Sequence, residues 1–401
     1  MAKMNTNFLN LKESYLFIEI SRRIQAFTQD NPNVQLIRMG IGDVTLPLVP
    51  AVVKAGKKAF DEMGVKETFR GYEDSGKGYD FLRKAIAGHY KTFGVGTFPS
   101  ADEIFVTDGA KPDSGNIGDV FADDSVVAVT DPTYPVYVDS SIMGGKRVIY
   151  TSANESNGFS AMPDSLKETP NIIFLCSPNN PTGTAYTFEQ LKTWVDYANT
   201  HKAVIVYDAA YEAFITEKDK PRSIYQIEGA RSCAIEICSL SKTAGFTGTR
   251  CGYTVVPKAL MLDSPDGQVP LYKLWSRRQS SKFNGVSYPV QRAAEAVFST
   301  KGQKQIGEAI DYYRKNAQLI TQTLSELGVE FTGGINSPYV WFKCPNALDS
   351  WDFFDVMLNR ANVVGTPGAG FGENGKNRFR LTAFNTHENT QEAMTRVKGL
   401  F

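Results

Sequence analysis

"CAIEICSLSKTAGFTGTRCG", residues 233–252, joins a short apolar run to a loop of glycines and hydroxyl residues. The run is too short for a helix and is typical of a strand buried in a sheet. In the loop, small residues let the backbone approach a ligand, and the hydroxyls of Ser239 and Ser241 beside Arg250 suit a phosphate group. Lys242 stands where the strand ends. It is either a further phosphate contact or a lysine that forms a Schiff base with an aldehyde cofactor.

Six similar apolar runs, rich in β-branched residues, surround this one in the chain. They are "EIFVTDGAK" (103–111), "SVVAVTDPTY" (125–134), "KRVIYTSA" (146–153), "NIIFLCSPNNPTG" (171–183), "AVIVYDAAY" (203–211) and "GYTVVP" (252–257). Several are separated by helical patterns, of which 188–201 is the clearest, since its apolar residues fall on one face. Strands that alternate with helices predict an α/β fold around a mainly parallel sheet with right-handed crossovers.

Polar residues follow these predicted strands where each one ends. Because open α/β sheets bind ligands at the carboxyl ends of their strands, we expect these residues to converge on one crevice. They are Asp108 to Lys111, which includes Ala110, then Tyr134, Asn180, Asp208, Tyr211 and Ser239 to Lys242.

After residue 290 the pattern changes to that of a smaller α+β unit. Apolar residues at helical spacing predict one long helix over 303–327, followed by strands at 338–344 and 378–384 and a final helix over 390–401. We therefore predict three parts: an N-terminal arm that contributes to a small domain (1–45), a large cofactor-binding domain (46–295) and a C-terminal small domain (296–401).

Composition argues against several classes of partner. With 43 basic and 43 acidic residues, the chain shows no charge bias towards nucleic acid or an acidic membrane surface. The five cysteines lack C-x-x-C spacing and the three histidines are scattered, so we predict reduced thiols and no metal site. With neither a leader-like N-terminus nor an apolar segment long enough to span a bilayer, we expect a cytoplasmic protein.

The motifs together resemble a known family, the fold type I pyridoxal phosphate (PLP) aminotransferases. "SPNNPTG" (177–183), "YDAAY" (207–211), "SLSKTAGFTGTR" (239–250) and "RFRLTAF" (378–384) follow the family's order, and the resemblance covers nearly the whole chain. Within the family, the chain resembles the LL-diaminopimelate aminotransferases. The motifs that carry this closer resemblance are "NLKESYLF" (10–17), "IGDVTLP" (41–47), "TFRGYEDSGKG" (68–78), "TDGAK" (107–111), "SPNNPTGT" (177–184) and "KFNGVSYPVQ" (282–291).

The resemblance implies a reaction and a cofactor. PLP would support amino transfer between L,L-2,6-diaminopimelate and 2-oxoglutarate, giving L-glutamate and, after cyclisation, tetrahydrodipicolinate, in diaminopimelate and lysine biosynthesis. Lys242 would carry the cofactor and then act as general base, because a cationic neighbour and partial desolvation lower a lysine's pKa. Asp208 would keep the pyridine nitrogen protonated, so that the ring can accept electrons.

The remaining assignments also follow from the resemblance. Asn180 and Tyr211 would bind the cofactor's phenolic oxygen, and Tyr134 would stack on its ring. Its phosphate would be held by Ala110, Lys111, Ser239, Ser241 and Arg250. The substrate would meet Tyr15, Gly42, Lys111, Tyr134, Asn180 and Asn284, and Arg380 would grip its α-carboxylate, with Arg378 the competing candidate. Tyr72 and Asn284 would come from the neighbouring subunit, which implies a homodimer with shared active sites.

One residue departs from the pattern, and two other functions remain open. Ser75 stands where plant members carry a glutamate that recognises the distal amino group, while Glu73 and Asp74 lie nearby in sequence. The first alternative is an aminotransferase for aromatic amino acids, alanine or aspartate, or a PLP β-lyase on the same fold. The second is the ligand-sensing domain of a transcription regulator, which the presence of both Lys242 and Asp208 disfavours.

Overall fold

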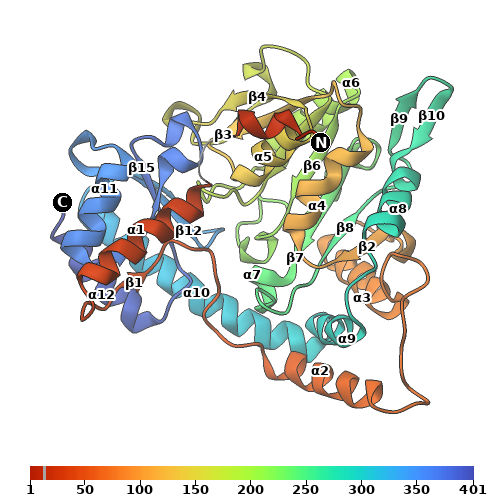
Figure 1. The fold of residues 1–401 in the computed structure, drawn as a ribbon, viewed down its shortest axis with the longest axis horizontal. Coiled ribbons are helices and arrows are strands. Elements are labelled where there is room, and N and C mark those ends of the chain that lie inside the picture. The colour runs from red at the N-terminus through yellow and green to blue at the C-terminus, as the bar shows by residue number, and fades with distance from the viewer. Residues whose placement is uncertain (12–14) are drawn as a thin grey trace.

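The computed structural model describes residues 1–11 and 15–401, in which helices surround a seven-stranded and a four-stranded sheet and two further strand pairs form (Figure 1). The predicted motif at 10–17 therefore lies partly outside the described residues. The predicted α/β class is confirmed, because a seven-stranded, mostly parallel sheet forms the centre of the larger part.

The seven-stranded sheet runs in the order β2–β8–β7–β6–β5–β3–β4. Each of the seven apolar runs found in the sequence supplies one strand. All neighbours are parallel except β8, which is antiparallel to both β2 and β7. The strands are β2 (Ile104–Thr107), β3 (Val126–Asp131), β4 (Arg147–Ser152), β5 (Ile172–Cys176), β6 (Val204–Asp208), β7 (Ala234–Ser239) and β8 (Gly252–Val255).

Apart from the edge strand β4, the strands of this sheet are buried on both faces, which explains why they are mainly apolar. In β5, Ile173 and Leu175 pack in one hydrophobic cluster with Trp194 of α6 (Phe188–His201). Ile172 and Phe174 point to the other face and pack in a second cluster. Because successive side chains of a strand point to opposite faces, a strand covered on both sides has few polar positions.

The second sheet is antiparallel and lies towards the C-terminal end of the chain, coloured blue in Figure 1. Its order is β11 (Phe331–Gly333), β12 (Tyr339–Lys343), β15 (Arg378–Thr382) and β14 (Thr366–Pro367). Helix α1 (Leu16–Asp30) packs in the same hydrophobic cluster as this sheet. The N-terminal strand β1 (Ile37–Arg38) pairs with β13 (Val363–Val364), so the two ends of the chain meet in this part of the molecule.

One continuous helix, α10 (Thr300–Glu326), contributes to both parts. Its Ile306 and Ile310 pack in a cluster on one face of the large sheet, whereas Ile320 and Leu324 pack in the cluster of the small sheet. The proposed domain boundaries at 45 and 295 stay a prediction.

The remaining elements cover the sheets or extend from them. The β9–β10 hairpin projects from the large sheet (Figure 1). These elements are α2 (Pro50–Met63), α3 (Asp80–Tyr90), α4 (Ala110–Asn116), α5 (Pro135–Met143), α7 (Leu240–Ala244), β9 (Met261–Ser264), β10 (Gly267–Pro270), α8 (Leu271–Lys282), α9 (Tyr288–Val297), α11 (Ser350–Val356) and α12 (His387–Lys398).

Two findings bear on the environment of the protein. All five cysteines are buried as free thiols. Among the described residues, no helix combines the length and the apolar character that crossing a bilayer requires.

Candidate active site

Lys242 lies on the short helix α7, which begins as soon as β7 ends. The side chain of Ser239 accepts a hydrogen bond from the backbone of Ser241 at 3.1 Å and so caps the helix. Lys242 Nζ donates to the carbonyl of Gly42. The pKa of Lys242 is lowered to about 8: burial has the largest effect, the charge of Asp43 opposes it, and the cations Arg380 and Arg250 act in the same direction as burial.

Arg250, at the other end of the loop, lies beside Ser241 at the start of α7. Its Nη1 donates to Ser241 Oγ at 3.1 Å and to the Thr247 carbonyl at 3.2 Å. Its guanidinium covers Gly109, the residue before α4, so closely that a Cβ added there would lie 2.2 Å from Arg250 Nη2. Ala110 and Lys111 begin α4 at this point. The loop serines, Arg250 and the first turn of α4 are therefore brought together.

Asp208 ends β6 and is only 6% exposed. Tyr137 Oη donates to its Oδ2 at 2.6 Å, and the backbone N–H of Ala210 donates to its Oδ1 at 3.0 Å. Burial raises the pKa of Asp208, and these two hydrogen bonds act in the opposite direction. Sequence reasoning missed Tyr137, although it follows the predicted residue Tyr134 by three positions.

Arg380 comes from β15 of the small sheet and is 1% exposed. Its guanidinium donates to Asn180 Oδ1 and to the Gly40 carbonyl. Among the described residues, no acceptor lies within hydrogen-bonding distance of its buried Nε. A buried, incompletely paired guanidinium fits an anionic ligand such as a carboxylate.

Arg378 lies two residues away in the same strand but is engaged elsewhere. It is also 1% exposed and forms ion pairs with Glu155 and Glu330, the latter at 2.8 Å. The structure thus brings Arg380, and not Arg378, to the residues around Lys242.

Four tyrosines line the remainder of this region. Tyr211 and Tyr339 have their hydroxyl oxygens 2.9 Å apart. Burial, followed by the influence of Tyr15, raises the pKa of Tyr134 well above its ordinary value. The ammonium of Lys111 lies 5.1 Å from the centre of the Tyr15 ring. Sequence reasoning missed Tyr339, because its run of apolar neighbours gave no sign of a polar role.

Two predicted residues are not brought to this cluster within the chain. Tyr72 lies between α2 and α3 and is 82% exposed, and Asn284 is exposed just after α8. Among the described residues, no hydrogen bond or ring contact joins either to the residues around Lys242. Close by, the Glu73 carboxylate accepts backbone hydrogen bonds from Ser75 at 2.8 Å and Gly78 at 3.1 Å, so it stabilises its own loop.

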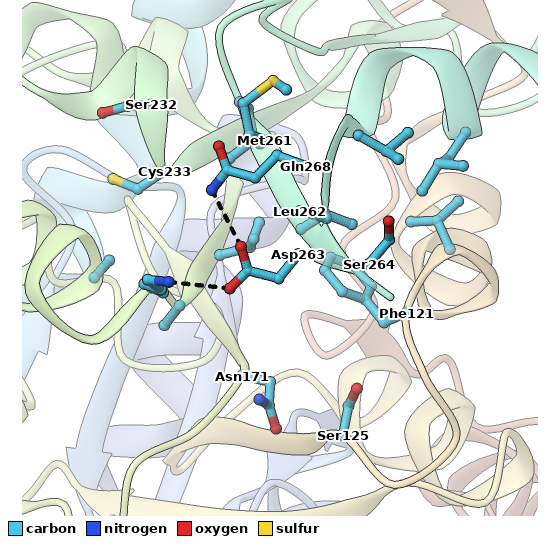
Figure 2. A pocket seen from close by; sticks show the side chains of 18 of the residues that line it. Phe121, Ser125, Asn171, Ser232, Cys233, Met261, Leu262, Asp263, Ser264 and Gln268 are labelled. Atoms are coloured by element: carbon cyan, nitrogen blue, oxygen red, sulfur yellow. Dashed lines mark hydrogen bonds and ion pairs between the residues drawn. The ribbon is translucent and has the colours of Figure 1, made fainter. Parts of the chain in front are cut away.

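A separate cavity of about 580 Å³ lies at the opposite edge of the large sheet (Figure 2). Ser125, Asn171 and Cys233, which line it, each precede a strand, and residues of the β9–β10 hairpin form one wall. None of the predicted site residues lines this cavity. The candidate active site is therefore the cluster at the carboxyl ends of the strands, where the fold class places ligands. Within the described part of the chain, no group of three or more histidine, cysteine, aspartate or glutamate residues could hold a metal ion.

Comparison with known proteins decides the family. The model of the aminotransferase class I and II family matches residues 34–397. The chain belongs to this family. Members of the class I and II aminotransferases depend on PLP.

Relatives within the family are similar over their full length. Two curated relatives named LL-diaminopimelate aminotransferase, from Lachnospira eligens and Methanosphaera stadtmanae, are 54% and 51% identical, with 100% of this chain and 100% and 99% of theirs covered. A solved L,L-diaminopimelate aminotransferase from Chlamydomonas reinhardtii is 40% identical, with a TM-score of 0.93 over 99% of this chain and 98% of that one. An aspartate aminotransferase from Thermus thermophilus, 20% identical with a TM-score of 0.87 and full coverage of both chains, shares the fold.

The residues of this aminotransferase fit PLP. The lack of a side chain at Gly109 and Gly252 leaves a cradle beside Arg250, since a Cβ at Gly252 would lie 3.0 Å from Gly109 Cα. The buried Asp208 carboxylate suits the protonated nitrogen of a pyridine ring, and Lys242, with its lowered pKa, supplies an amine between these two groups.

Proposed function

We propose that the protein transfers an amino group between L,L-2,6-diaminopimelate and 2-oxoglutarate, giving L-glutamate and an amino-keto acid that cyclises to tetrahydrodipicolinate. This would place it in diaminopimelate and lysine biosynthesis. The observation that carries the chemistry is the buried Arg380, with an unpaired Nε, in the same cluster as Lys242. The substrate rests on the relatives of that name, which are 51–54% identical over the whole chain.

We assign the binding of PLP to residues at or just after the ends of five strands of the large sheet, β2, β3, β5, β6 and β7. Ser239, Ser241, Arg250 and the start of α4 at Ala110 and Lys111 would hold the phosphate. Asp208 would hold a proton at the ring nitrogen, with Tyr137 keeping the carboxylate in place. Asn180 and Tyr211 would donate to the phenolic oxygen, and Tyr134 would pack on the ring. When bound, PLP supplies an aldehyde that condenses with amines and a ring that accepts electrons.

Lys242 is the proposed proton carrier. A general base is most effective when its pKa lies near the working pH. With a pKa of about 8, about a tenth of Lys242 Nζ is neutral at pH 7 and able to accept a proton, far more than for an ordinary lysine. Its hydrogen bond to the carbonyl of Gly42 holds the amine beside a residue to which we assign substrate binding.

We assign substrate binding to residues from both ends of the chain. Arg380 would bind the α-carboxylate that diaminopimelate, glutamate and 2-oxoglutarate share. Tyr15, Gly42 and Lys111 would meet the rest of the substrate, with the Lys111 ammonium serving a distal carboxylate. Asn284 would complete this side of the site from a second subunit.

The proposed assembly is a homodimer, located in the cytoplasm. Support for the dimer comes from an apolar surface around α2 and the loop that follows it, where Phe60 is 68% exposed and Phe69 is 57% exposed, beside the exposed Tyr72. Large exposed apolar patches mark interaction surfaces. The buried, unpaired cysteines are consistent with a reducing compartment. We keep the division into a large domain (46–295) and a small domain formed by 1–45 and 296–401 as part of this proposal.

A panel of amino donors tests the function. We expect kcat/KM to be highest for the L,L isomer. A pocket built to hydrogen-bond a distal group rejects analogues that lack it by about 10⁴-fold or more. Lysine, without the distal carboxylate, and the meso isomer, with inverted geometry, should be poor donors. If phenylalanine or aspartate reacted best, or elimination replaced amino transfer, the broader aminotransferase or the β-lyase would be the correct function.

A further inference from the structure

Tyr339, the first residue of β12, touches both halves of the candidate site. It is 1% exposed, and its hydroxyl oxygen lies 2.9 Å from that of Tyr211, on the cofactor side. Its ring faces the guanidinium of Arg380, whose Cζ lies 4.3 Å from the ring centre. A guanidinium over an aromatic face at this distance is held by a cation–π interaction. One side chain therefore contacts two residues that have separate proposed tasks.

The Tyr339 hydroxyl also lies directly against the backbone that holds Lys242. A Cβ added to Gly42 would come 2.0 Å from Tyr339 Oη, so the chain at Gly42 fits only because it has no side chain there. The Gly42 carbonyl accepts the hydrogen bond from Lys242 Nζ. The position of the tyrosine ring thus limits where this carbonyl can lie.

The backbone of Tyr339 is fixed as tightly as its side chain. Its carbonyl accepts a hydrogen bond from the Gly334 N–H at 2.9 Å, and its N–H donates to Ser337 Oγ at 3.1 Å. A Cβ at Gly183, in the loop that carries Asn180, would lie 2.5 Å from the Tyr339 carbonyl oxygen. The strand start is therefore packed against the loop of the large sheet, and the ring has little freedom to move.

The number of protons that the two phenols can donate indicates which hydroxyl is the donor between Tyr211 and Tyr339. A phenol has one proton to donate. If Tyr211 donates its proton to the phenolic oxygen of PLP, it must accept in its contact with Tyr339, so the proton between the two hydroxyls comes from Tyr339. The nearby positive charge of Arg380 favours this direction, because it makes the Tyr339 hydroxyl a better donor.

We propose that Tyr339 is a positioning residue, which orients Tyr211 through its hydroxyl and Arg380 through its ring face. The proposal rests on the functions proposed above for Tyr211 and Arg380. It assigns two separable effects to one side chain: the hydroxyl acts on the cofactor side, and the ring acts on the substrate carboxylate.

Two substitutions separate the effects. Tyr339→Phe removes the hydroxyl and keeps the ring, and Tyr339→Leu removes both. Tyr225→Phe is the matched control, because the hydroxyl of that buried tyrosine lies 3.2 Å from the Ala234 carbonyl and 3.1 Å from the Val255 carbonyl, and within the described residues no hydrogen bond or ring contact joins it to the site. The readouts are the pH titration of the bound cofactor's absorbance without substrate, the KM for 2-oxoglutarate, and calorimetric binding of 2-oxoglutarate to the cofactor-free protein.

For Tyr339→Phe we expect the absorbance midpoint to move to higher pH, because a weaker donor at Tyr211 stabilises the oxygen anion less. The KM for 2-oxoglutarate should change by less than about threefold, since the cation–π contact remains. For Tyr339→Leu we expect the same shift of the midpoint and, in addition, a KM for 2-oxoglutarate raised about tenfold. Calorimetry should show binding of 2-oxoglutarate weakened by the same factor, which corresponds to about 1.4 kcal/mol. Tyr225→Phe should alter none of these values.

An unchanged midpoint in Tyr339→Phe, with a shifted midpoint in Tyr211→Phe, would overturn the proposal and leave the proposed function intact. If Tyr211→Phe did not move the midpoint either, both the role of Tyr211 and this inference would be wrong. Equal KM values in the Phe and Leu variants would exclude the action of the ring on Arg380. Should the Leu variant fail to fold, Tyr339→Phe decides through the midpoint alone.

Discussion

The phenol of Tyr137 donates a hydrogen bond of 2.6 Å to Asp208 Oδ2 and thereby links helix α5 to the end of strand β6. The ring of Tyr137 is stacked on Phe174 of β5, with ring centres 4.7 Å apart, so the donor cannot turn away. Burial alone would favour a protonated, neutral Asp208. The hydrogen bond opposes this effect and keeps the carboxylate able to bind a cation.

Tyr137→Phe should therefore raise the pKa of Asp208. We expect the acid limb of the kcat/KM profile to move to higher pH and kcat/KM at pH 7 to fall roughly tenfold, the value of one hydrogen bond to a charged group. Measuring kcat/KM from pH 5 to 9 checks this, with Tyr150→Phe, a half-exposed tyrosine on β4, as control. A profile that coincided with that of the unmodified protein would contradict it.

Lys242→Ala should fold normally but hold PLP without a covalent bond. Borohydride followed by peptide mass analysis should fix the cofactor to Lys242 in the unmodified protein and to no lysine in the variant. Lys111→Ala is the control, because Lys111 begins the neighbouring helix α4 yet should leave the covalent link intact. A reduced adduct in the Lys242→Ala protein would rule out the assignment.

Arg380→Lys and Arg378→Lys should have opposite consequences. The first removes the fork that binds a carboxylate, so we expect KM for both substrates to rise at least about tenfold with little change in Tm. The second weakens a buried guanidinium paired with Glu155 and Glu330, so Tm should fall while KM changes little. Kinetics and thermal unfolding of both variants test this, and a KM effect from Arg378→Lys would reverse the two roles.

Glu236→Gln should change how stability depends on pH. Burial raises the pKa of this core carboxyl from 4.5 to about 7, although Tyr90, Ser223 and the Ile224 N–H donate to it. Between these values the folded protein binds the proton more tightly than the unfolded chain, so stability from this group is lost as pH rises from about 4.5 to 7. The Tm of the glutamine variant should fall less than that of the unmodified protein between pH 4.5 and 7. The same dependence of Tm on pH in both proteins would show that Glu236 does not titrate in this range.

Mixing inactive Tyr72→Ala and Lys242→Ala chains should restore activity if the site is shared between subunits. Each mixed dimer would then contain one intact site, so up to about a quarter of the full activity is expected after random exchange of subunits. Chains that carry two different affinity tags, co-purified after mixing, measure the exchange itself. No recovery in fully exchanged dimers would mean that Tyr72 acts within its own chain.

The fold was readable from the sequence where burial leaves a strong pattern. Apart from the edge strand β4, each strand of the large sheet is a mainly apolar run because both of its faces are buried, and the helices at 188–201 and 300–326 show their buried face directly. Strand direction was not readable: "GYTVVP" gives no sign that β8 runs antiparallel to its neighbours. The β9–β10 hairpin was missed, although "SPDG" at 264–267 carries a turn signal.

The site residues that lie close to the carboxyl ends of strands could be predicted from the sequence, whereas two that lie farther from those ends could not. Asp208 and Lys242 follow β6 and β7 immediately, so the topology alone brings them together. Tyr137 and Tyr339 were missed because their contacts join residues 71 and 128 positions apart, and both lie among apolar neighbours that suggest only packing. Tyr72 and Asn284 depend on a second chain, so their role stays a prediction.

Ser239 and Gly252 are paired residues in the ladder between β7 and β8. The loop that carries Lys242 and Arg250 therefore begins and ends at the same point of the sheet. Inserting or deleting one residue within that loop would displace Lys242 relative to Arg250, or it would shift the register of β8 against β7 by one residue. Such a shift turns every following side chain of β8 to the opposite face of the sheet. Evolution can therefore change this loop by substitution but scarcely by length. New specificities have to arise elsewhere, in segments whose ends are not paired in this way, such as the loop between α2 and α3.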